Sequence, residues 1–325
     1  MLKITVRYYL GIDGGGTKTT CVVGNESELL STATTGPSNI VRVGEAQARE
    51  SLQQSVRQAC AAAGITPAQV SHTCVGGSGA GRPELAAILR RILADIVPTP
   101  IDVVGDIQTS LEAAFGPGPG VIVIAGTGSI AYGRDRRGHT ARAGGWGFAI
   151  GDEGSAHWIG RTAVAAVLRA ADPRDVTSTP AARGGSAESQ DSLAAGLSKS
   201  WGVTSLDDLA RAANSTPPPD FATLFPAVAT SQDVLARQVL FHAANELAHI
   251  VAIVTLRLFP KEDTAPVPVA MTGGVFRHSQ PVREDFYNEL RKIDPRVVIN
   301  PRVVDPVEGA LRMARKAAVR RLMAP

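Results

Sequence analysis

LGIDGGGTKTT, residues 10–20, places an acid and three consecutive glycines between two apolar segments. Residues 8–13 and 19–24 have the pattern of strands, so the glycines form a tight strand-turn-strand hairpin. Glycines leave backbone N–H groups unshielded by side chains, and such a nest can hold phosphate oxygens. A Rossmann loop is excluded because a strand, not a helix, follows the glycines, and the Walker A spacing is absent. The stretch therefore predicts a phosphate-binding hairpin.

The side chains of this hairpin suit a nucleotide and its metal ion. Asp13 stands at the strand end and is placed to hold Mg²⁺ through water, because Mg²⁺ keeps much of its hydration shell. Thr17 and Lys18 add a hydroxyl and a cation nearby. The alternative is a plain glycine hairpin without a ligand. The predicted nucleotide-binding residues of the hairpin are Asp13, Gly14, Gly15, Gly16, Thr17 and Lys18.

A second hairpin of similar design follows the Gly- and Pro-rich break at residues 116–120. Its turn contains Gly126, Thr127 and Gly128, which could cradle phosphates or form a tight β-turn without a ligand. Residues 12–17 and 124–129 make a weak internal repeat, which predicts two domains of similar design. We expect a first domain at residues 1–116 and a larger second domain at 117–306, with a further helix near the end of the chain.

Strands and helices alternate along the chain, which predicts the α/β class. Further strand patterns lie at residues 72–76, 101–105, 267–271 and 297–300. Helix patterns lie at 45–63, 84–97, 232–259 and 308–322, and a short helix follows Asp106 and ends at about Phe115. Gly273 and Gly274 follow a buried strand and would let a flat group such as adenine approach the backbone, or would serve a plain strand-to-helix turn. Residues 172–192 are rich in Ala, Gly, Ser and Pro, so we expect a loop there.

Composition excludes several classes of protein. The 325 residues, 44% of them hydrophobic, suffice for two compact domains, and a net charge of +3 does not argue for nucleic acid. Cys21, Cys60 and Cys74 form no C-x-x-C pair, which argues against a disulfide framework or a zinc site and favours a reducing cytoplasm. We find no targeting signal, and the longest apolar stretch, residues 247–259, is too short to span a bilayer.

Four longer motifs carry a family resemblance: GPSN at residues 36–39, VVGD at 103–106, AGTGSIAYG at 125–133 and GGWGFAIGDEGSAHWIG at 144–160. With them the chain resembles the sugar kinase, Hsp70 and actin superfamily. Within it, the chain is similar to the N-acetylglucosamine kinase family and its benzoyl-CoA-reductase-activator-type ATPase relatives. The resemblance implies a two-domain actin-like ATPase (ribonuclease H-like) fold with a ligand cleft between the domains, in which a C-terminal helix at 307–325 packs back on the first domain. It also implies ATP and Mg²⁺ as cofactors and a homodimer.

The resemblance also implies roles for single residues. Asp106 matches the catalytic base that accepts the proton of the sugar 6-hydroxyl; its alternative is a helix N-cap. Asn39 matches a sugar-binding residue or is a turn residue, and Trp146 offers an indole face to the sugar or lies in the core. Glu153 contacts the sugar or caps the helix that follows. The implied substrate-binding residues are Asn39, Asp106, Gly128, Ser129, Gly145, Trp146 and Asp152.

These roles imply an ATP-dependent kinase of the 6-hydroxyl of an amino sugar, N-acetylglucosamine first. Glucosamine, N-acetylmuramic acid and glucose are alternatives, because one polar contact can decide among them. An alternative of another class is an activator ATPase of a dehydratase or reductase system, which needs cysteine ligands for an iron–sulfur cluster. The three cysteines do not match such a segment. The expected partner is therefore a small sugar, not a nucleic acid or a membrane.

Two further clusters have competing interpretations. His242, Glu246 and His249 share one helix face, which could bind a metal but is more typical of a solvated polar stripe. Basic residues near the chain's end could suggest nucleic acid, but the helix dipole favours cations there in any case. These basic residues are Arg312, Arg315, Lys316, Arg320 and Arg321.

Overall fold

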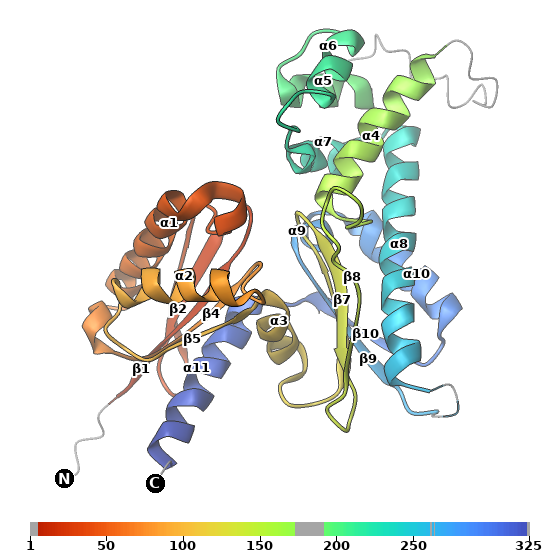
Figure 1. Ribbon diagram of the computed structural model, residues 1–325. Coiled ribbons are helices and arrows are strands. Elements are labelled where there is room, and N and C mark those ends of the chain that lie inside the picture. Colours follow the sequence, from red (N-terminus) through yellow and green to blue (C-terminus); the bar gives the residue numbers. More distant parts are fainter. Residues whose placement is uncertain (1–5, 173–191, 261, 263, 324–325) are drawn as a thin grey trace. The chain divides into compact units, whose positions relative to one another are not determined.

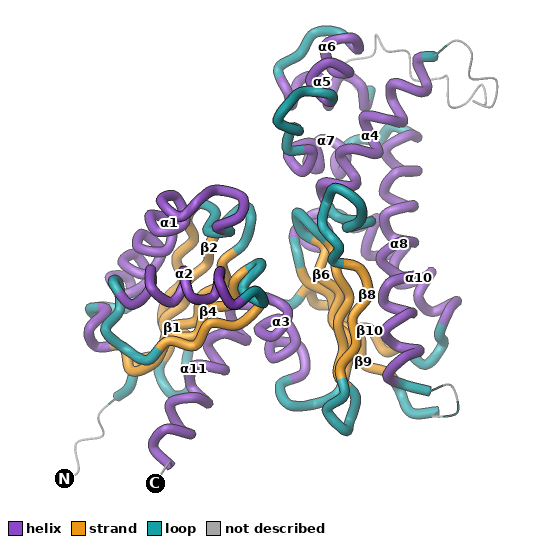
Figure 2. The backbone as a smooth tube through the Cα atoms, in the orientation of Figure 1, coloured by secondary structure: helices purple, strands orange, loops and turns teal. Residues whose placement is uncertain are grey.

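The computed structural model describes residues 6–172, 192–260, 262 and 264–323 (Figures 1 and 2). The chain divides into two compact units. The first unit combines Met1–Gly118 with Val304–Pro325, and the second unit is Pro119–Val303. Each unit is built on one five-stranded sheet.

The sheet of the first unit has the strand order β3-β2-β1-β4-β5. Its strands are β1 (Tyr8–Gly14), β2 (Thr19–Gly24), β3 (Leu29–Thr35), β4 (Val70–Gly77) and β5 (Ile101–Gly105). The first three strands pair antiparallel, and β1–β4 and β4–β5 pair parallel. Because parallel strands need a crossover, helices connect β3 to β4 and β4 to β5.

Helices cover both faces of this sheet. Alternation along β1 sends Leu10 and Ile12 to one face, where they pack with residues of α1 (Ile40–Ala62) and α2 (Pro83–Ala94). The short 3₁₀ helix η1 (Pro67–Gln69) precedes β4. On the other face Tyr9 packs with α11 (Pro306–Met323), which also packs against α3 (Asp106–Phe115). The contact between α11 and α3 is close, since a Cβ on Gly309 would lie 1.9 Å from the Thr109 carbonyl oxygen.

The sheet of the second unit repeats the design of the first. Its order is β10-β9-β6-β7-β8, with β6–β7–β8 antiparallel and β6–β9–β10 parallel. The strands are β6 (Gly120–Ala125), β7 (Ser129–Arg134), β8 (Thr140–Gly144), β9 (Val267–Thr272) and β10 (Val297–Val303). This topology confirms the internal repeat that the two glycine turns predict.

Helix α8 (Val234–Leu258) forms the centre of the second unit's core. It packs against β6, β7 and β8 and against α10 (Gln280–Ile293). By length and hydropathy alone α8 could cross a membrane, but 61% of its most apolar window is buried inside the unit. Its apolar side chains therefore belong to the core. The remaining helices are α4 (Ala156–Ala171), α5 (Leu193–Trp201), α6 (Leu206–Ala213), η2 (Phe221–Leu224), α7 (Phe225–Thr230) and α9 (Gly274–His278).

The structure corrects several sequence expectations. Strand β3 was not expected, because as an edge strand it leaves Leu29 and Leu30 exposed and lacks a clean alternation. Helix α1 begins at Ile40, where Asn39 caps it, but its backbone is not helical at Gly44, so the expected helix at 45–63 corresponds to the part of α1 after this break. Of the expected loop at 172–192, residues 173–191 lie outside the described residues, and Ser192 caps α5. The short helices α5, α6 and α7 that follow were missed.

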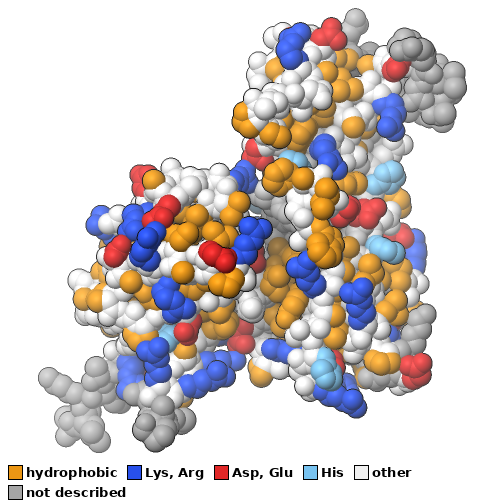
Figure 3. Space-filling view, in the orientation of Figure 1, with side chains coloured by type: hydrophobic (Ala, Val, Ile, Leu, Met, Phe, Trp, Pro, Cys, Tyr) orange, Lys and Arg blue, Asp and Glu red, His pale blue; other side chains and the backbone are white. Residues whose placement is uncertain are grey.

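The basic residues of α11 hold this helix to the first unit. The Arg315 guanidinium donates to the carbonyl oxygens of Asn25 and Glu28, both at 2.7 Å. Lys316 pairs with Glu112 on α3. Figure 3 shows acidic and basic side chains interspersed over the visible face of each unit. Arg312, Arg315 and Lys316 therefore have structural partners within the first unit, which favours the interpretation without nucleic acid.

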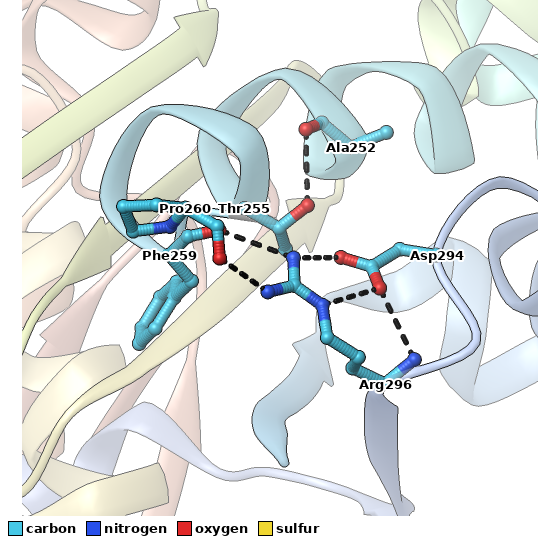
Figure 4. Close-up of polar contacts among 6 residues, drawn as sticks. All are labelled: Ala252, Thr255, Phe259, Pro260, Asp294 and Arg296. Carbon is cyan, nitrogen blue, oxygen red and sulfur yellow. Dashed lines mark hydrogen bonds and ion pairs between the residues drawn. The ribbon is translucent and has the colours of Figure 1, made fainter. Parts of the chain in front are cut away.

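A buried ion pair fixes the end of α8 to the loop between α10 and β10 (Figure 4). The Arg296 guanidinium makes two hydrogen bonds to the Asp294 carboxylate, at 3.0 and 2.8 Å. It also donates to the carbonyl oxygens of Pro260 at 2.6 Å and Phe259 at 3.1 Å. The Asp294 side chain is only 5% exposed, and Arg296 provides both its guanidinium and its backbone N–H to the carboxylate.

Replacing Arg296 with Met is expected to destabilise the second unit by about 3 kcal/mol, because a buried carboxylate loses its cation and two carbonyls lose their donors. Urea unfolding followed by circular dichroism measures this. Arg291→Met, on the exposed side of α10, is the control and should change stability by less than about 0.5 kcal/mol. Equal unfolding midpoints for the two variants would show that the Arg296 contacts contribute nothing.

Candidate active site

The glycine hairpin closes between β1 and β2. The Gly15 N–H donates to the Lys18 carbonyl oxygen at 3.0 Å, which tightens the turn. Asp13 is partly buried and lies opposite Thr20 in the ladder, whereas Thr17 and Lys18 are exposed at the tip. The hairpin thus presents a hydroxyl and a cation outward, with a carboxylate at its base.

The carbonyl groups of the hairpin hold two other segments. The Gly15 carbonyl oxygen accepts from the backbone N–H groups of Ser38 at 3.1 Å and Asn39 at 3.2 Å. The Gly14 carbonyl oxygen accepts from the Ser78 N–H at 3.0 Å. The GPSN motif and the loop after β4 are therefore fixed to the predicted phosphate-binding turn.

Asn39 has both a structural and a potential ligand-binding role. It is the N-cap of α1, and its Oδ1 accepts from the Val41 N–H at 3.1 Å. Its Nδ2 donates to Ser78 Oγ at 3.3 Å. These contacts set the orientation of the amide and leave Nδ2 a second N–H, which a sugar hydroxyl could accept.

Asp106 directly follows β5 as the first residue of α3. The N-cap is Gly105, so the N-cap alternative for Asp106 is wrong. Its Oδ1 accepts from the Ile107 N–H at 3.0 Å, and the Ser78 hydroxyl lies close enough to lower the pKa of the carboxyl. Burial raises the pKa of Asp106 to about 6, against the lowering effect of these donors. Such a group is ionised at pH 7 and still a better proton acceptor than an ordinary carboxylate.

Ser78 is the residue that sequence reasoning missed. It lies in the glycine-rich stretch VGGSGAG, residues 75–81. Ser78 stands where β4 ends between β1 and β5, and the carboxyl ends of neighbouring parallel strands meet at one edge of a sheet. The sequence signal for this role was a polar residue at the carboxyl end of an expected strand.

The turn of the second unit is tied to the long GGWGFAIGDEGSAHWIG motif. The Gly126 N–H donates to the Gly128 carbonyl oxygen at 2.9 Å, closing the turn. The Ser129 hydroxyl donates to the Glu153 carbonyl oxygen at 2.6 Å, and the Ala156 N–H donates to the Gly126 carbonyl oxygen at 2.8 Å. Turn and motif therefore form one structural element.

Asp152 lies at the centre of this element. It is the one non-glycine residue with a positive φ, 60°, in the described part of the chain, and it is 8% exposed. Burial raises its pKa, while the N–H groups of Gly147 and Ser129 lower it and Glu153 raises it further. A Cβ on Gly128 would lie 2.7 Å from Asp152 Oδ2, so the carboxylate abuts the turn backbone. Strained polar residues of this kind are typical of functional sites.

The structure decides between the alternative interpretations of Trp146 and of Glu153 in this motif. Trp146 is 68% exposed, so the core alternative is wrong for it. The Arg142 guanidinium lies 4.6 Å from the Trp146 ring centroid. Its neighbour Gly145 has a φ of 70°, a conformation that favours glycine. Glu153 does not cap α4, because Ser155 does so, accepting from the Trp158 N–H.

The Gly273 and Gly274 loop lies beside the second turn. Gly273 has a φ of 107°, and a Cβ there would come within 2.2 Å of the Ala125 carbonyl oxygen. Gly274 begins α9. Glycine at 273 therefore allows the ends of β6 and β9 to approach, and it brings the two predicted nucleotide loops of this unit together.

Other candidate ligand groups find no support. Among the described residues, no group of three or more His, Cys, Asp and Glu side chains could hold a metal ion, so the stripe on α8 is not a metal site. Cys21, Cys60 and Cys74 are free and buried in the first unit. Burial raises the pKa of Cys60 to about 11 and that of Cys74 to about 12, so these thiols are inert.

Replacing Asp106 with Asn is expected to stabilise the folded protein above pH 6. The pKa near 6 exceeds the ordinary 3.8, so ionisation at neutral pH opposes folding, and this penalty fades as pH falls from 6 toward 3.8. We expect a gain of about 1–3 kcal/mol at pH 8 that is smaller at pH 5. Urea unfolding at both pH values measures it. Asp95→Asn, exposed at the end of α2, is the control, and a pH-independent gain would contradict the burial argument.

Comparison with known proteins identifies relatives of this chain. A protein of Clostridium acetobutylicum named N-acetylmuramic acid/N-acetylglucosamine kinase is 37% identical over 171 residues, 52% of this chain and 56% of that protein. The matched region thus spans little more than half of that relative. The N-acetyl-D-glucosamine kinase of Dictyostelium discoideum is 27% identical over 326 residues, covering 94% of this chain and 97% of that protein.

Solved structures and a family model agree with these relatives. A Chromobacterium violaceum structure, described as a candidate N-acetylglucosamine kinase, superposes with a TM-score of 0.71 at 26% identity, covering 95% of this chain and 99% of that one. The fold is the two-domain actin-like ATPase fold of sugar kinases. The model of the BadF/BadG/BcrA/BcrD ATPase family matches residues 10–314. By this match over nearly its whole length, the chain belongs to the BadF/BadG/BcrA/BcrD ATPase family.

Proposed function

We propose that this chain is an ATP-dependent kinase that phosphorylates the 6-hydroxyl of an amino sugar, N-acetylglucosamine first. One observation carries the proposal. Ser78 interacts with three groups of this site: the Asn39 amide, the Gly14 carbonyl of the phosphate-binding turn, and the partly buried carboxylate of Asp106, which has a pKa near 6. A base, a hydroxyl-binding amide and a phosphate-binding turn at one sheet edge suit phosphoryl transfer to an alcohol.

In this proposal Asp106 accepts the proton of the sugar hydroxyl as the hydroxyl oxygen attacks the γ-phosphorus of ATP. The Ile107 N–H and the Ser78 hydroxyl hold the carboxylate in place for that transfer. Asn39 and Asp152 position other sugar hydroxyls, and the exposed indole of Trp146 contacts an apolar face or the acetamido methyl group. Asp106 leaves the step protonated and returns its proton to solvent after product release.

Nucleotide binding is assigned to the glycine turns. Backbone N–H groups at 14–16 and 126–128, other than those of Gly15 and Gly126 that close the turns, bind phosphate oxygens. Lys18 adds a cation, and the loop at Gly273 and Gly274 receives the adenine. Asp13 fits Mg²⁺, because it offers a carboxylate oxygen at the strand end beside the turn, and such ligands suit this hard cation. When bound, Mg²⁺ would neutralise phosphate charge.

N-acetylmuramic acid is the second candidate substrate, since the Clostridium relative is named for both sugars. It differs from N-acetylglucosamine by a lactyl ether, so one pocket contact decides between them. The activator-ATPase alternative is less supported, because the relatives are sugar kinases and the three thiols are buried. We also propose a cytoplasmic homodimer. Free cysteines suit a reducing compartment, and gel filtration with light scattering tests the dimer.

The test is ADP release with Mg²⁺ and ATP across N-acetylglucosamine, N-acetylmuramic acid, glucosamine, N-acetylmannosamine and glucose, with ³¹P NMR to place the new phosphate. We expect the N-acetylated sugars to stimulate release, and Asp106→Asn to lower kcat by roughly 10²–10⁴-fold, because the base is lost. Asp95→Asn should retain wild-type activity. If no sugar stimulates ADP release by the wild type, the kinase proposal fails.

A further inference from the structure

We infer that Ser78 is a positioning residue that sets the base and a sugar-binding amide in one fixed arrangement: its hydroxyl links Asn39 to Asp106, and its backbone fixes both to the phosphate-binding turn. This inference rests on the proposed function and adds to it a residue that neither the motifs nor the family resemblance assigns.

The sheet places Ser78 between its partners. Gly14 of β1 lies opposite Gly77 of β4, and Gly77 lies opposite Gly105 of β5. The next residues along β4 and β5, Ser78 and Asp106, therefore leave the sheet side by side at its carboxyl edge. Their proximity follows from strand register, so it does not depend on a flexible loop.

The backbone around Ser78 is held on both sides. The Ser78 N–H donates to the Gly14 carbonyl oxygen at 3.0 Å. The Ala80 N–H donates to the Gly77 carbonyl oxygen at 3.0 Å, and Gly79 takes a φ of 84°, which closes a turn directly after Ser78. The hydroxyl is thus aimed by main-chain hydrogen bonds before any ligand arrives.

Donor counting fixes the direction of the hydrogen-bond chain. A serine hydroxyl has one hydrogen, and an amide nitrogen is a donor only. Asn39 Nδ2 must therefore donate to Ser78 Oγ, and the single Ser78 hydrogen is left for the Asp106 carboxylate. The Asn39 Oδ1 is held by the Val41 N–H, so the amide is not expected to flip. The chain runs from Asn39 through Ser78 to Asp106.

The direction of this hydrogen-bond chain affects the ionisation of Asp106. A donor to the carboxylate favours its ionised form, whereas burial favours the protonated form. Ser78 therefore keeps Asp106 ionised at neutral pH in a site dry enough to make it a good base. Without the hydroxyl, Asp106 should stay protonated to a higher pH, and the Asn39 amide should lose its fixed orientation toward the sugar.

The experiment compares Ser78→Ala, Ser78→Thr and the wild type in the pH dependence of kcat/KM with the best sugar of the panel. Loss of the donor should shift the acid limb upward by about one pH unit, which lowers kcat/KM by about threefold at pH 6.5 and about tenfold at pH 5, with recovery toward pH 8.5. KM for the sugar should rise as well. Ser78→Thr keeps a hydroxyl and should restore the wild-type limb.

Ser110→Ala is the matched control. The Ser110 hydroxyl donates to the Asp106 main-chain carbonyl at 2.7 Å, not to the carboxylate, so its loss should leave the limb in place. Thermal unfolding of all variants checks that they fold. A second readout follows the Asp106 carboxyl by ¹³C NMR titration without substrate, where Ser78→Ala should raise its pKa.

The outcomes separate the two proposals. If the wild type is inactive but the Asp106 titration depends on Ser78, the kinase proposal fails and the link between Ser78 and Asp106 stands. An active wild type whose acid limb and Asp106 titration are both unmoved by Ser78→Ala would overturn the positioning role. An equal shift of the acid limb in Ser110→Ala would also overturn the positioning role, because the loss of any nearby hydroxyl would then have the same effect.

Discussion

The carbonyl groups of Gly14 and Gly15 organise the functional edge of the first unit. Each accepts backbone N–H groups from a segment distant in sequence: residues 38 and 39 on one side and residue 78 on the other. The Gly15 N–H also closes the turn by donating to the Lys18 carbonyl oxygen, so a phosphate would be bound by N–H groups of the hairpin that these contacts do not use. Removal of these main-chain bonds would separate the base, the amide and the turn from one another.

The two units apply one topology to different tasks. Both place a glycine turn between the first two strands and a pair of parallel strands beside them. In the first unit the parallel strands are followed by Ser78 and Asp106, to which we assign the proton transfer. In the second unit the corresponding position is Gly273, which has no side chain and whose backbone lies in close contact with that of Ala125.

Buried carboxylates make these sites costly to fold. Burial raises the pKa of both Asp106 and Asp152, and Asp152 also adopts a positive φ. The surrounding structure tolerates both because backbone N–H groups point at each carboxylate. Stability is supplied elsewhere, for example by α8 and the Arg296–Asp294 pair at its end.

The sequence by itself determined the α/β class, the internal repeat and most of the elements. The strand Ile101–Gly105 was predicted to the residue, and a short helix ending near Phe115 was predicted directly after Asp106, because period-two and period-3.6 patterns and glycine turns are local signals. The edge strand β3 and the short helices α5–α7 carried no such signal. Only the tertiary structure decided that Ser78 joins Asn39 and Asp106, that Trp146 is exposed, and that Asp152 abuts Gly128. These facts depend on strand register and on contacts between distant segments, which no local pattern records.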